Sequence, residues 1–203
     1  MSLVFYYAPM STAEITRAVL AELGVPHEVV TVDLKAGGAR TPEFLQLNPN
    51  GKVPVVVHDG EPVFESVAIT IYLGETFGVV KGLFPAPGKE RAKALKWLVW
   101  AHVSVGSSLA HLMLSTSPLV PAEQHNAKAG EAARAQVERL LGVLDQALTG
   151  VDYLVGNRYS LVDTHLASFV GYVQMVGVDL TRFTAIGAWL GRCQQRPSQR
   201  PPA

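Results

Sequence analysis

Residues 48–69 read NPNGKVPVVVHDGEPVFESVAI, and this stretch decides the fold. A turn rich in Pro, Asn and Gly runs into the short apolar β-branched run Val55–Val57. Asp59-Gly60 is typical of a tight hairpin turn, and residues 62–64 predict the second strand of that hairpin. An apolar helix is then expected to begin at Glu65-Ser66. The stretch therefore predicts a strand, a turn, a strand and a helix in immediate succession.

Two features of this stretch carry chemistry. Val53-Pro54 precedes a strand, and a bond before proline is the common place for a cis peptide. A cis bond there would turn the backbone N–H and C=O of Val53 away from the sheet, toward a peptide-like ligand. Ser66 lies at a helix start, where free N–H groups and the positive end of the helix dipole attract a carboxylate. Together the two features predict a site for a small acidic peptide.

The chain before this stretch alternates strands and helices. The fully apolar run Leu3–Tyr7 predicts a central strand, and Ser11 and Thr12 are candidate caps for a helix that ends at Gly24. Residues 27–32 predict a second strand, and residues 41–43 open a short helix. The order βαβαββα indicates an α/β, thioredoxin-like domain over residues 1–78.

The remainder of the chain is helical in pattern. Residues 79–88 are rich in Gly and Pro and predict a linker, and residues 89–203 predict an all-α C-terminal domain. Long helices are expected over residues 89–115 and 122–148, and a last helix over residues 184–195. Between them, Ser160 and Asp163 stand three residues apart before an apolar run, which is the pattern of a capping box.

Composition excludes several functions. Seventeen basic and seventeen acidic residues give a formal net charge of zero, which argues against nucleic-acid binding. The sequence shows no unbroken apolar run of about 20 residues, so we expect no membrane span. The single cysteine, Cys193, excludes an internal disulfide and a Cys-x-x-Cys redox pair and favours the cytoplasm. The histidines show no metal-ligand spacing, so no metal is expected.

Val-Pro before a strand, followed by Glu-Ser-x-Ala-Ile, resembles the glutathione site of the cytosolic glutathione transferases. The resemblance extends over the chain, since a helical second domain with this capping box also belongs to that family. It implies that glutathione is the co-substrate and that a Ser or Thr stands where bacterial relatives have a catalytic Cys. The residues implied to bind glutathione are Lys52, Val53, Pro54, Glu65 and Ser66, with Lys35 and Arg40 as further candidates for its glycyl carboxylate.

Such an enzyme activates glutathione by lowering the pKa of its thiol, because the thiolate is the nucleophile. A shift from about 8.5 to about 6.5 requires roughly 2.7 kcal/mol of thiolate stabilisation, within reach of one or two hydrogen bonds and a helix N-terminus. The candidate donors are Thr12, Ser11 and Tyr7, in that order. Thr12 takes the place of the catalytic residue of Cys-type members, and Arg17 follows it with the spacing seen in the Ser-type branch. Tyr7 matches the Tyr-type position, but a core aromatic with a satisfied hydroxyl is the favoured interpretation.

Glutathione transfer to a small hydrophobic electrophile is the leading hypothesis. The acceptor pocket is expected between the domains, with Met10, His102 and Leu109 among its lining. The same thiolate would serve an isomerase or a dehalogenase, and a non-catalytic glutathione-binding or assembly module of this fold is the alternative from another class. A disulfide reductase of the thioredoxin type is disfavoured, since no cysteine lies near residue 12. A homodimer is expected from the low charged fraction of 17% and from the apolar helices.

Overall fold

The computed structural model describes residues 2–117, 120–196 and 198. The described residues form two compact units, residues 2–86 with Ser198, and Pro87–Arg196. The boundary falls inside the predicted linker, residues 79–88. The last stretch of the predicted C-terminal domain, beyond residue 198, lies outside the described residues.

The first unit is built on a four-stranded mixed sheet in the order β2-β1-β3-β4. β1 (Leu3–Tyr7) is parallel to β2 (Glu28–Thr31) and antiparallel to β3 (Val55–His58), which pairs with β4 (Glu61–Phe64). The apolar strand β1 is central, as predicted, and Asp59-Gly60 forms the hairpin turn with positive φ at both residues. With its helices the unit has the predicted order βαβαββα.

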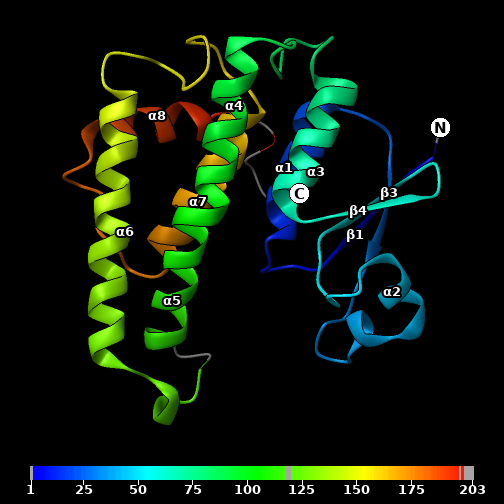
Figure 1. Cartoon of the computed structure of the whole chain (residues 1–203), viewed down its shortest axis with the longest axis horizontal. Coiled ribbons are helices and arrows are strands. Elements are labelled where there is room, and N and C mark those ends of the chain that lie inside the picture. Colours follow the sequence, from blue (N-terminus) through cyan, green and yellow to red (C-terminus); the bar gives the residue numbers. More distant parts are fainter. Residues whose placement is uncertain (1, 118–119, 197, 199–203) are drawn as a thin grey trace. The chain divides into compact units, whose positions relative to one another are not determined.

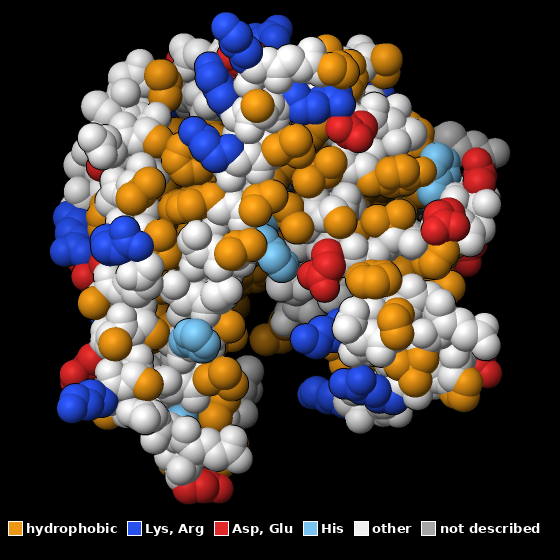
Figure 2. Space-filling model, in the orientation of Figure 1, with side chains coloured by type: hydrophobic (Ala, Val, Ile, Leu, Met, Phe, Trp, Pro, Cys, Tyr) orange, Lys and Arg blue, Asp and Glu red, His pale blue; other side chains and the backbone are white. Residues whose placement is uncertain are grey.

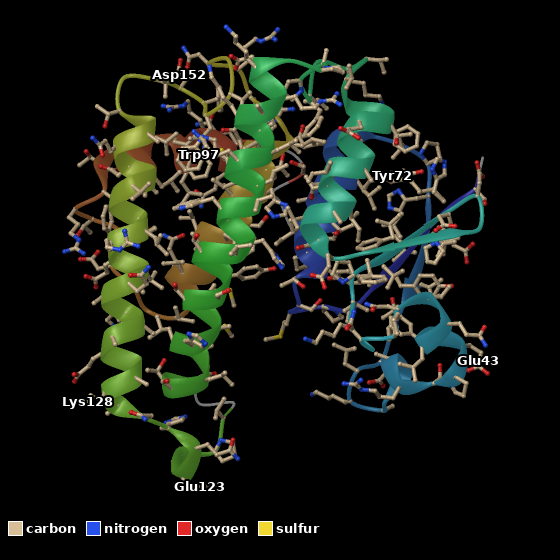
Figure 3. All side chains as sticks on the ribbon, viewed as in Figure 1. Glu43, Tyr72, Trp97, Glu123, Lys128 and Asp152 are labelled. Carbon is tan, nitrogen blue, oxygen red and sulfur yellow. The ribbon has the colours of Figure 1, made fainter. Side chains whose placement is uncertain are left out.

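Helices cover both faces of this sheet. Figure 1 shows α1 (Ala13–Leu23) and α3 (Ser66–Leu73) on one face and α2 (Pro42–Leu47) on the other. The short turns η1 (Gly38–Arg40) and η2 (Gly74–Gly78) precede α2 and follow α3. α3 is tied to the sheet by Tyr72, labelled in Figure 3, whose hydroxyl oxygen lies 2.6 Å from Nδ1 of His58. The core between helices and sheet is apolar; its largest fully buried side chains are Phe5, Ile15, Leu20, Leu23, Ile69 and Leu73.

The second unit is helical. Its first helix runs unbroken through α4 (Lys89–Trp100), the π-helical turn η3 (Ala101–Gly106) and α5 (Ser107–Thr116). The turn η4 (Ala122–Gln124) precedes α6 (Ala127–Leu148), which packs along α5 (Figure 1). The predicted second helix therefore starts five residues later than expected, where Asn126 accepts a hydrogen bond from the N–H of Ala129. α7 (Leu161–Met175) and α8 (Thr184–Gln194) complete the unit.

The predicted capping box begins α7, and its carboxylate is buried. Oδ2 of Asp163 accepts hydrogen bonds from the N–H and the hydroxyl of Ser160, both at 3.0 Å. Its Oδ1 accepts from the N–H of Leu154 at 3.2 Å and from Nε1 of Trp189 at 2.9 Å. Burial raises the pKa of Asp163, and these hydrogen bonds act in the opposite direction. Asp163 thus joins the start of α7 to the preceding loop and to α8.

The first helix of this unit carries apolar side chains at its surface (Figure 2). By length and composition alone, Lys89–Thr116 is apolar enough to cross a membrane, with a mean hydropathy of 1.2. Core helices of water-soluble proteins meet the same criterion, so the finding is weak grounds for a membrane span. Its large exposed apolar residues are Val99, Val103, Met113 and Leu114.

Candidate functional site

The strand register brings the predicted residues to one end of the sheet. Tyr6 pairs with Val55, and Val55 pairs with Phe64. The last residues of β1, the Val53-Pro54 peptide and the Glu65-Ser66 pair therefore lie beside one another. Helices α1 and α3 both begin at this end, because each follows directly on a strand that ends there. Two helix N-termini, each with free N–H groups, thus face the same region.

The peptide group of Val53 is unpaired among the described residues at this end, although the residue is only 8% exposed. The Val53-Pro54 bond is cis, as expected from the sequence. Neither the N–H nor the C=O of Val53 forms a hydrogen bond with another described residue. The preceding loop is held by Asn48, which is 3% exposed, donates from Nδ2 to the Lys52 carbonyl at 2.7 Å and accepts from the N–H of Asn50 at 3.0 Å. The loop thus presents a backbone donor and acceptor for a peptide-like ligand.

Glu65 and Ser66 occupy the start of α3. Glu65 is the N-cap residue and has a φ of +70°, a left-handed conformation that costs a non-glycine residue about 1–3 kcal/mol. Such backbone strain clusters at binding sites. Ser66 is 3% exposed, and its carbonyl accepts a hydrogen bond from Oγ1 of Thr70 at 2.9 Å. The pair stands where the N–H groups of α3 are free to bind a carboxylate.

Tyr7 is hydrogen-bonded inside the protein. Its hydroxyl donates to Oε1 of Glu14 in the first turn of α1, and Nε of Arg17 donates to Oε2 of the same carboxylate at 2.6 Å. Burial raises the pKa of Tyr7, and the hydrogen bond to Glu14 and the negative charge of Glu14 raise it further. A phenol whose proton is directed at a carboxylate is a poor donor to a second anion.

Ser11 and Thr12 differ in their hydrogen bonds. The Ser11 hydroxyl donates to the carbonyl of Ala8 at 2.7 Å and accepts from the N–H of Ala13 at 3.1 Å, so its side chain ties the loop to the start of α1. Thr12 is at the N-cap position but makes no capping hydrogen bond, which corrects the expectation that it would cap the helix. Its side chain is exposed and forms no hydrogen bond with another described residue.

The three cations predicted to meet a glycyl carboxylate are all exposed, on two loops of the first unit. Lys52 is next to Val53. Arg40 ends η1, on the segment between β2 and α2, and its Nη1 lies 3.3 Å from the carbonyl of Asn50; a Cβ on Gly51 would meet this guanidinium at 2.5 Å. Lys35 lies in the turn after β2, where its N–H donates to Asp33. Arg40 therefore lies nearer to the Val53 loop than Lys35 does.

The predicted acceptor residues belong to different parts of the chain. Met10 has a φ of +56° and is 85% exposed in the loop before α1. His102 is half-buried in η3, with its ring edge-on to Phe169, and Leu109 is 4% exposed and packs in the helical core. His165 of α7 also packs against Phe169; burial, and the nearby charge of His102, lower its pKa to about 3.

Sequence reasoning missed Glu14, because a carboxylate in the first turn of a helix ordinarily serves the helix dipole. The alternation of strand β1 places Tyr7 on the same face as the buried Phe5. This was the available signal that the Tyr7 hydroxyl needs a partner inside the protein. A separate groove of about 450 Å³ lies between β2 and α2, with Tyr6, Val30, Val32 and Phe44 in its lining. It contains none of the predicted site residues.

Comparison with known proteins identifies the family of this chain. Residues 1–75 match the family model "Glutathione S-transferase, N-terminal domain", and residues 110–197 match "Glutathione S-transferase, C-terminal domain". The chain is 30% identical to the disulfide-bond oxidoreductase YfcG of Escherichia coli, covering 95% of this chain and 90% of that protein. It is 36% identical to glutathione S-transferase F10 of Arabidopsis thaliana, over 82% of this chain and 79% of that protein.

Solved structures give the same result. A sphingomonad glutathione S-transferase complexed with glutathione is 31% identical, with a TM-score of 0.83 over 97% of this chain and 94% of that one. A Burkholderia graminis glutathione transferase, with two glutathione molecules per subunit, is 28% identical, with a TM-score of 0.87 over 98% of this chain and 85% of that one. On these matches the chain belongs to the glutathione S-transferase superfamily.

Proposed function

We propose that this protein binds glutathione at the end of the sheet where β1 and β4 end and β3 begins, and transfers it as a thiolate to a small hydrophobic electrophile. The observation that carries the proposal is the register of β1, β3 and β4, which gathers Val53, Glu65, Ser66 and the start of α1. These groups match a ligand with a peptide bond, carboxylates and a thiol.

Each part of glutathione has a proposed partner. The N–H and C=O of Val53 pair with the cysteinyl residue, with Pro54 fixing the start of β3. Glu65 binds the γ-glutamyl ammonium, and Ser66 with the free N–H groups of α3 binds the γ-glutamyl carboxylate. Lys52 pairs with the glycyl carboxylate, and Arg40 or Lys35 takes this role if Lys52 does not. Glutathione bound to the sphingomonad and Burkholderia relatives supports glutathione as the ligand.

Thr12 is the proposed donor to the glutathione thiolate. The hydroxyl protons of Tyr7 and Ser11 are directed at Glu14 and at the Ala8 carbonyl, whereas the exposed Thr12 hydroxyl has no partner among the described residues. A hydrogen bond to a charged acceptor contributes about 1.5–3 kcal/mol, and the N-terminus of α1 adds to it. The bound thiol therefore ionises near neutral pH.

In the proposed reaction the thiol proton leaves to solvent and the glutathione sulfur attacks an electrophilic carbon. A C–S bond forms, and the leaving group departs with the bonding electron pair, or, in an addition, the adduct takes up a proton. Met10, which is exposed in the loop before α1, is the proposed acceptor contact. Leu109 is buried in the helical core and is not proposed as one. The same thiolate supports the isomerase and dehalogenase alternatives, which give no net conjugation: an isomerase releases glutathione unchanged, and in a reductive dehalogenase a second glutathione thiolate attacks the adduct sulfur and releases the reduced product with oxidised glutathione.

A glutathione-dependent disulfide reductase is the second candidate, favoured by the similarity to YfcG, which is named a disulfide-bond oxidoreductase. In that reaction the glutathione thiolate attacks one sulfur of a disulfide and releases the other as a thiolate. A second glutathione thiolate then attacks the mixed disulfide, giving oxidised glutathione and a second thiol. This chemistry needs no protein cysteine, so the absence of a cysteine near residue 12 does not oppose it.

We further propose that the chain works in the cytoplasm as a homodimer, without metal or nucleic acid. The formal net charge of zero argues against nucleic acid. The low charged fraction of 17% and the exposed apolar residues of the α4–α5 helix support an assembly of two copies.

The test is calorimetric titration with glutathione, followed by assays with an activated aryl halide and with a small disulfide. Glu65→Gln is expected to weaken glutathione binding about tenfold or more, because it removes a charge-assisted contact. Glu61→Gln, at the other end of β4, removes the same charge and should leave binding unchanged. Turnover of the aryl halide supports the transferase, and turnover of the disulfide alone supports the reductase. Binding without turnover of either acceptor supports the non-catalytic module, and no binding contradicts the proposal.

A further inference from the structure

A chain of three polar side chains crosses from the end of β1 to the first turns of α1. The Tyr7 hydroxyl donates to one oxygen of Glu14, and Nε of Arg17 donates to the other at 2.6 Å. The side chains of Arg17 and Glu14 are 26% and 28% exposed, so the ion pair is partly shielded from solvent. Glu14 thus engages both the phenol and the guanidinium that stand nearest to the start of α1 in the sequence.

This arrangement bears directly on thiol chemistry. Thr12, the proposed donor, is the N-cap of α1, and Glu14 is only two residues further along the same first turn. A carboxylate in this turn opposes a second anion, whereas a phenol and a guanidinium would stabilise it. The Glu14 carboxylate offsets the charge of Arg17 and holds the proton of the Tyr7 hydroxyl.

We propose that Glu14 withholds the Tyr7 hydroxyl and the Arg17 guanidinium from the glutathione sulfur, and so limits how strongly this site stabilises the thiolate. The inference rests on the proposed function, because it assumes that glutathione binds at the start of α1. Under it, Thr12 is the donor in the native protein because Glu14 occupies the two competing groups. Glu14 is then a positioning residue that acts through Tyr7 and Arg17.

The test compares Glu14→Gln with the native protein by recording the ultraviolet thiolate absorbance of the glutathione complex against pH. Glu14→Gln is expected to lower the pKa of the bound thiol by about one unit, since it removes a nearby like charge. Glu22→Gln removes the same charge near the other end of α1 and should leave that pKa unchanged. In the Glu14→Gln background, Tyr7→Phe should raise the pKa again, because it removes a phenol that is no longer held by a charged carboxylate. In the native background Tyr7→Phe should have little effect.

A second measurement needs no glutathione. The phenol of Tyr7, isolated as the difference between native and Tyr7→Phe absorbance titrations, should ionise at lower pH in Glu14→Gln, because its acceptor loses the negative charge.

The outcomes separate this inference from the proposed function. Failure of glutathione to bind contradicts both. If the native complex shows a lowered thiol pKa and Glu14→Gln leaves it unchanged or raises it, the proposed function stands and the role of Glu14 is wrong. If only Glu14→Gln lowers the thiol pKa, Glu14 suppresses ionisation in the native protein, which supports the inference and contradicts the proposed activation. If the thiol pKa is lowered in neither protein, both the proposed activation of glutathione and the role of Glu14 are wrong.

Discussion

At the scale of single residues, hydrogen-bond partners separate the three hydroxyls that the sequence left as candidates. Tyr7 was expected to have a satisfied hydroxyl, and its bond to Glu14 confirms this. The Ser11 hydroxyl is hydrogen-bonded to the loop and to the first turn of α1. The sequence predicted the three candidates by position, but their partners depend on how the loop after β1 folds back onto α1, which periodicity does not encode.

Thr16 provides a prediction about stability. Its hydroxyl is fully buried in α1 and has no hydrogen-bond partner among the described residues. A buried hydroxyl without a hydrogen-bond partner lowers the free energy of unfolding by about 1–3 kcal/mol. Thr16→Val, nearly equal in shape, should raise the free energy of unfolding by about 1 kcal/mol in a urea titration. Thr70→Val is the matched control: its fully buried hydroxyl donates to the Ser66 carbonyl at 2.9 Å, so its loss should lower stability. A destabilised Thr16→Val would show that the hydroxyl is bound by water or another group.

His165 makes the stability of the folded protein depend on pH. Burial and the nearby charge of His102 lower its pKa to about 3, against about 6.5 in an unfolded chain. The unfolded state therefore binds the proton more tightly, and stability falls as pH drops through 6.5, approaching about 1.4 kcal/mol per pH unit. Stability should fall by about 2 kcal/mol between pH 6.5 and 4.5 from this group alone.

Urea titrations at both pH values, with native protein and His165→Gln, measure this contribution as a difference. The variant should lose most of the acid sensitivity, whereas His111→Gln, at an exposed position of α5, should retain it. Equal acid sensitivity in native protein and His165→Gln would show that His165 is not the buried neutral group described.

At the scale of elements, the capping box of α7 makes the largest expected contribution to the free energy of unfolding. Asp163→Ala removes an acceptor from four donors and leaves the buried Nε1 of Trp189 without a partner. We expect a loss of about 3 kcal/mol or more in the free energy of unfolding, measured by urea titration. Asp179→Ala removes an exposed carboxylate from the loop before α8 and should have a small effect. A small loss of stability in Asp163→Ala would contradict the interpretation that these hydrogen bonds stabilise the fold.

Elements with local signals were predicted well. The hairpin followed from Asp59-Gly60 between two apolar runs, and α7 followed from Ser160 and Asp163. The sequence did not predict η3, since one extra residue in a helical turn leaves the composition unchanged. It also placed the start of α6 too early, because alanines continue the helical pattern without marking its first turn. The links of Asp163 to Leu154 and Trp189 are tertiary and had no signal in spacing.

At the scale of the whole molecule, the α4–α5 helix predicts an assembly. Val103 is 60% exposed and Val99 is 47% exposed one turn earlier. If these residues are covered by a second copy, Val103→Asp should convert the dimer to a monomer in sedimentation equilibrium, because a buried unpaired charge is costly. Met175→Asp, at a residue of α7 that is 74% exposed, should leave the assembly unchanged. A native monomer, or a dimer unaffected by Val103→Asp, would contradict this interface.

The central claim is that Thr12 stabilises the thiolate of bound glutathione, and the pH titration of thiolate absorbance tests it most directly. The native complex should show a bound thiol pKa of about 6.5, against about 8.5 for a free thiol. Thr12→Val should raise that value by at least about one unit, because the isosteric side chain cannot donate, and Thr12→Ser should preserve it. A native complex with an unshifted thiol, or a Thr12→Val complex with the native pKa, would contradict this role of Thr12.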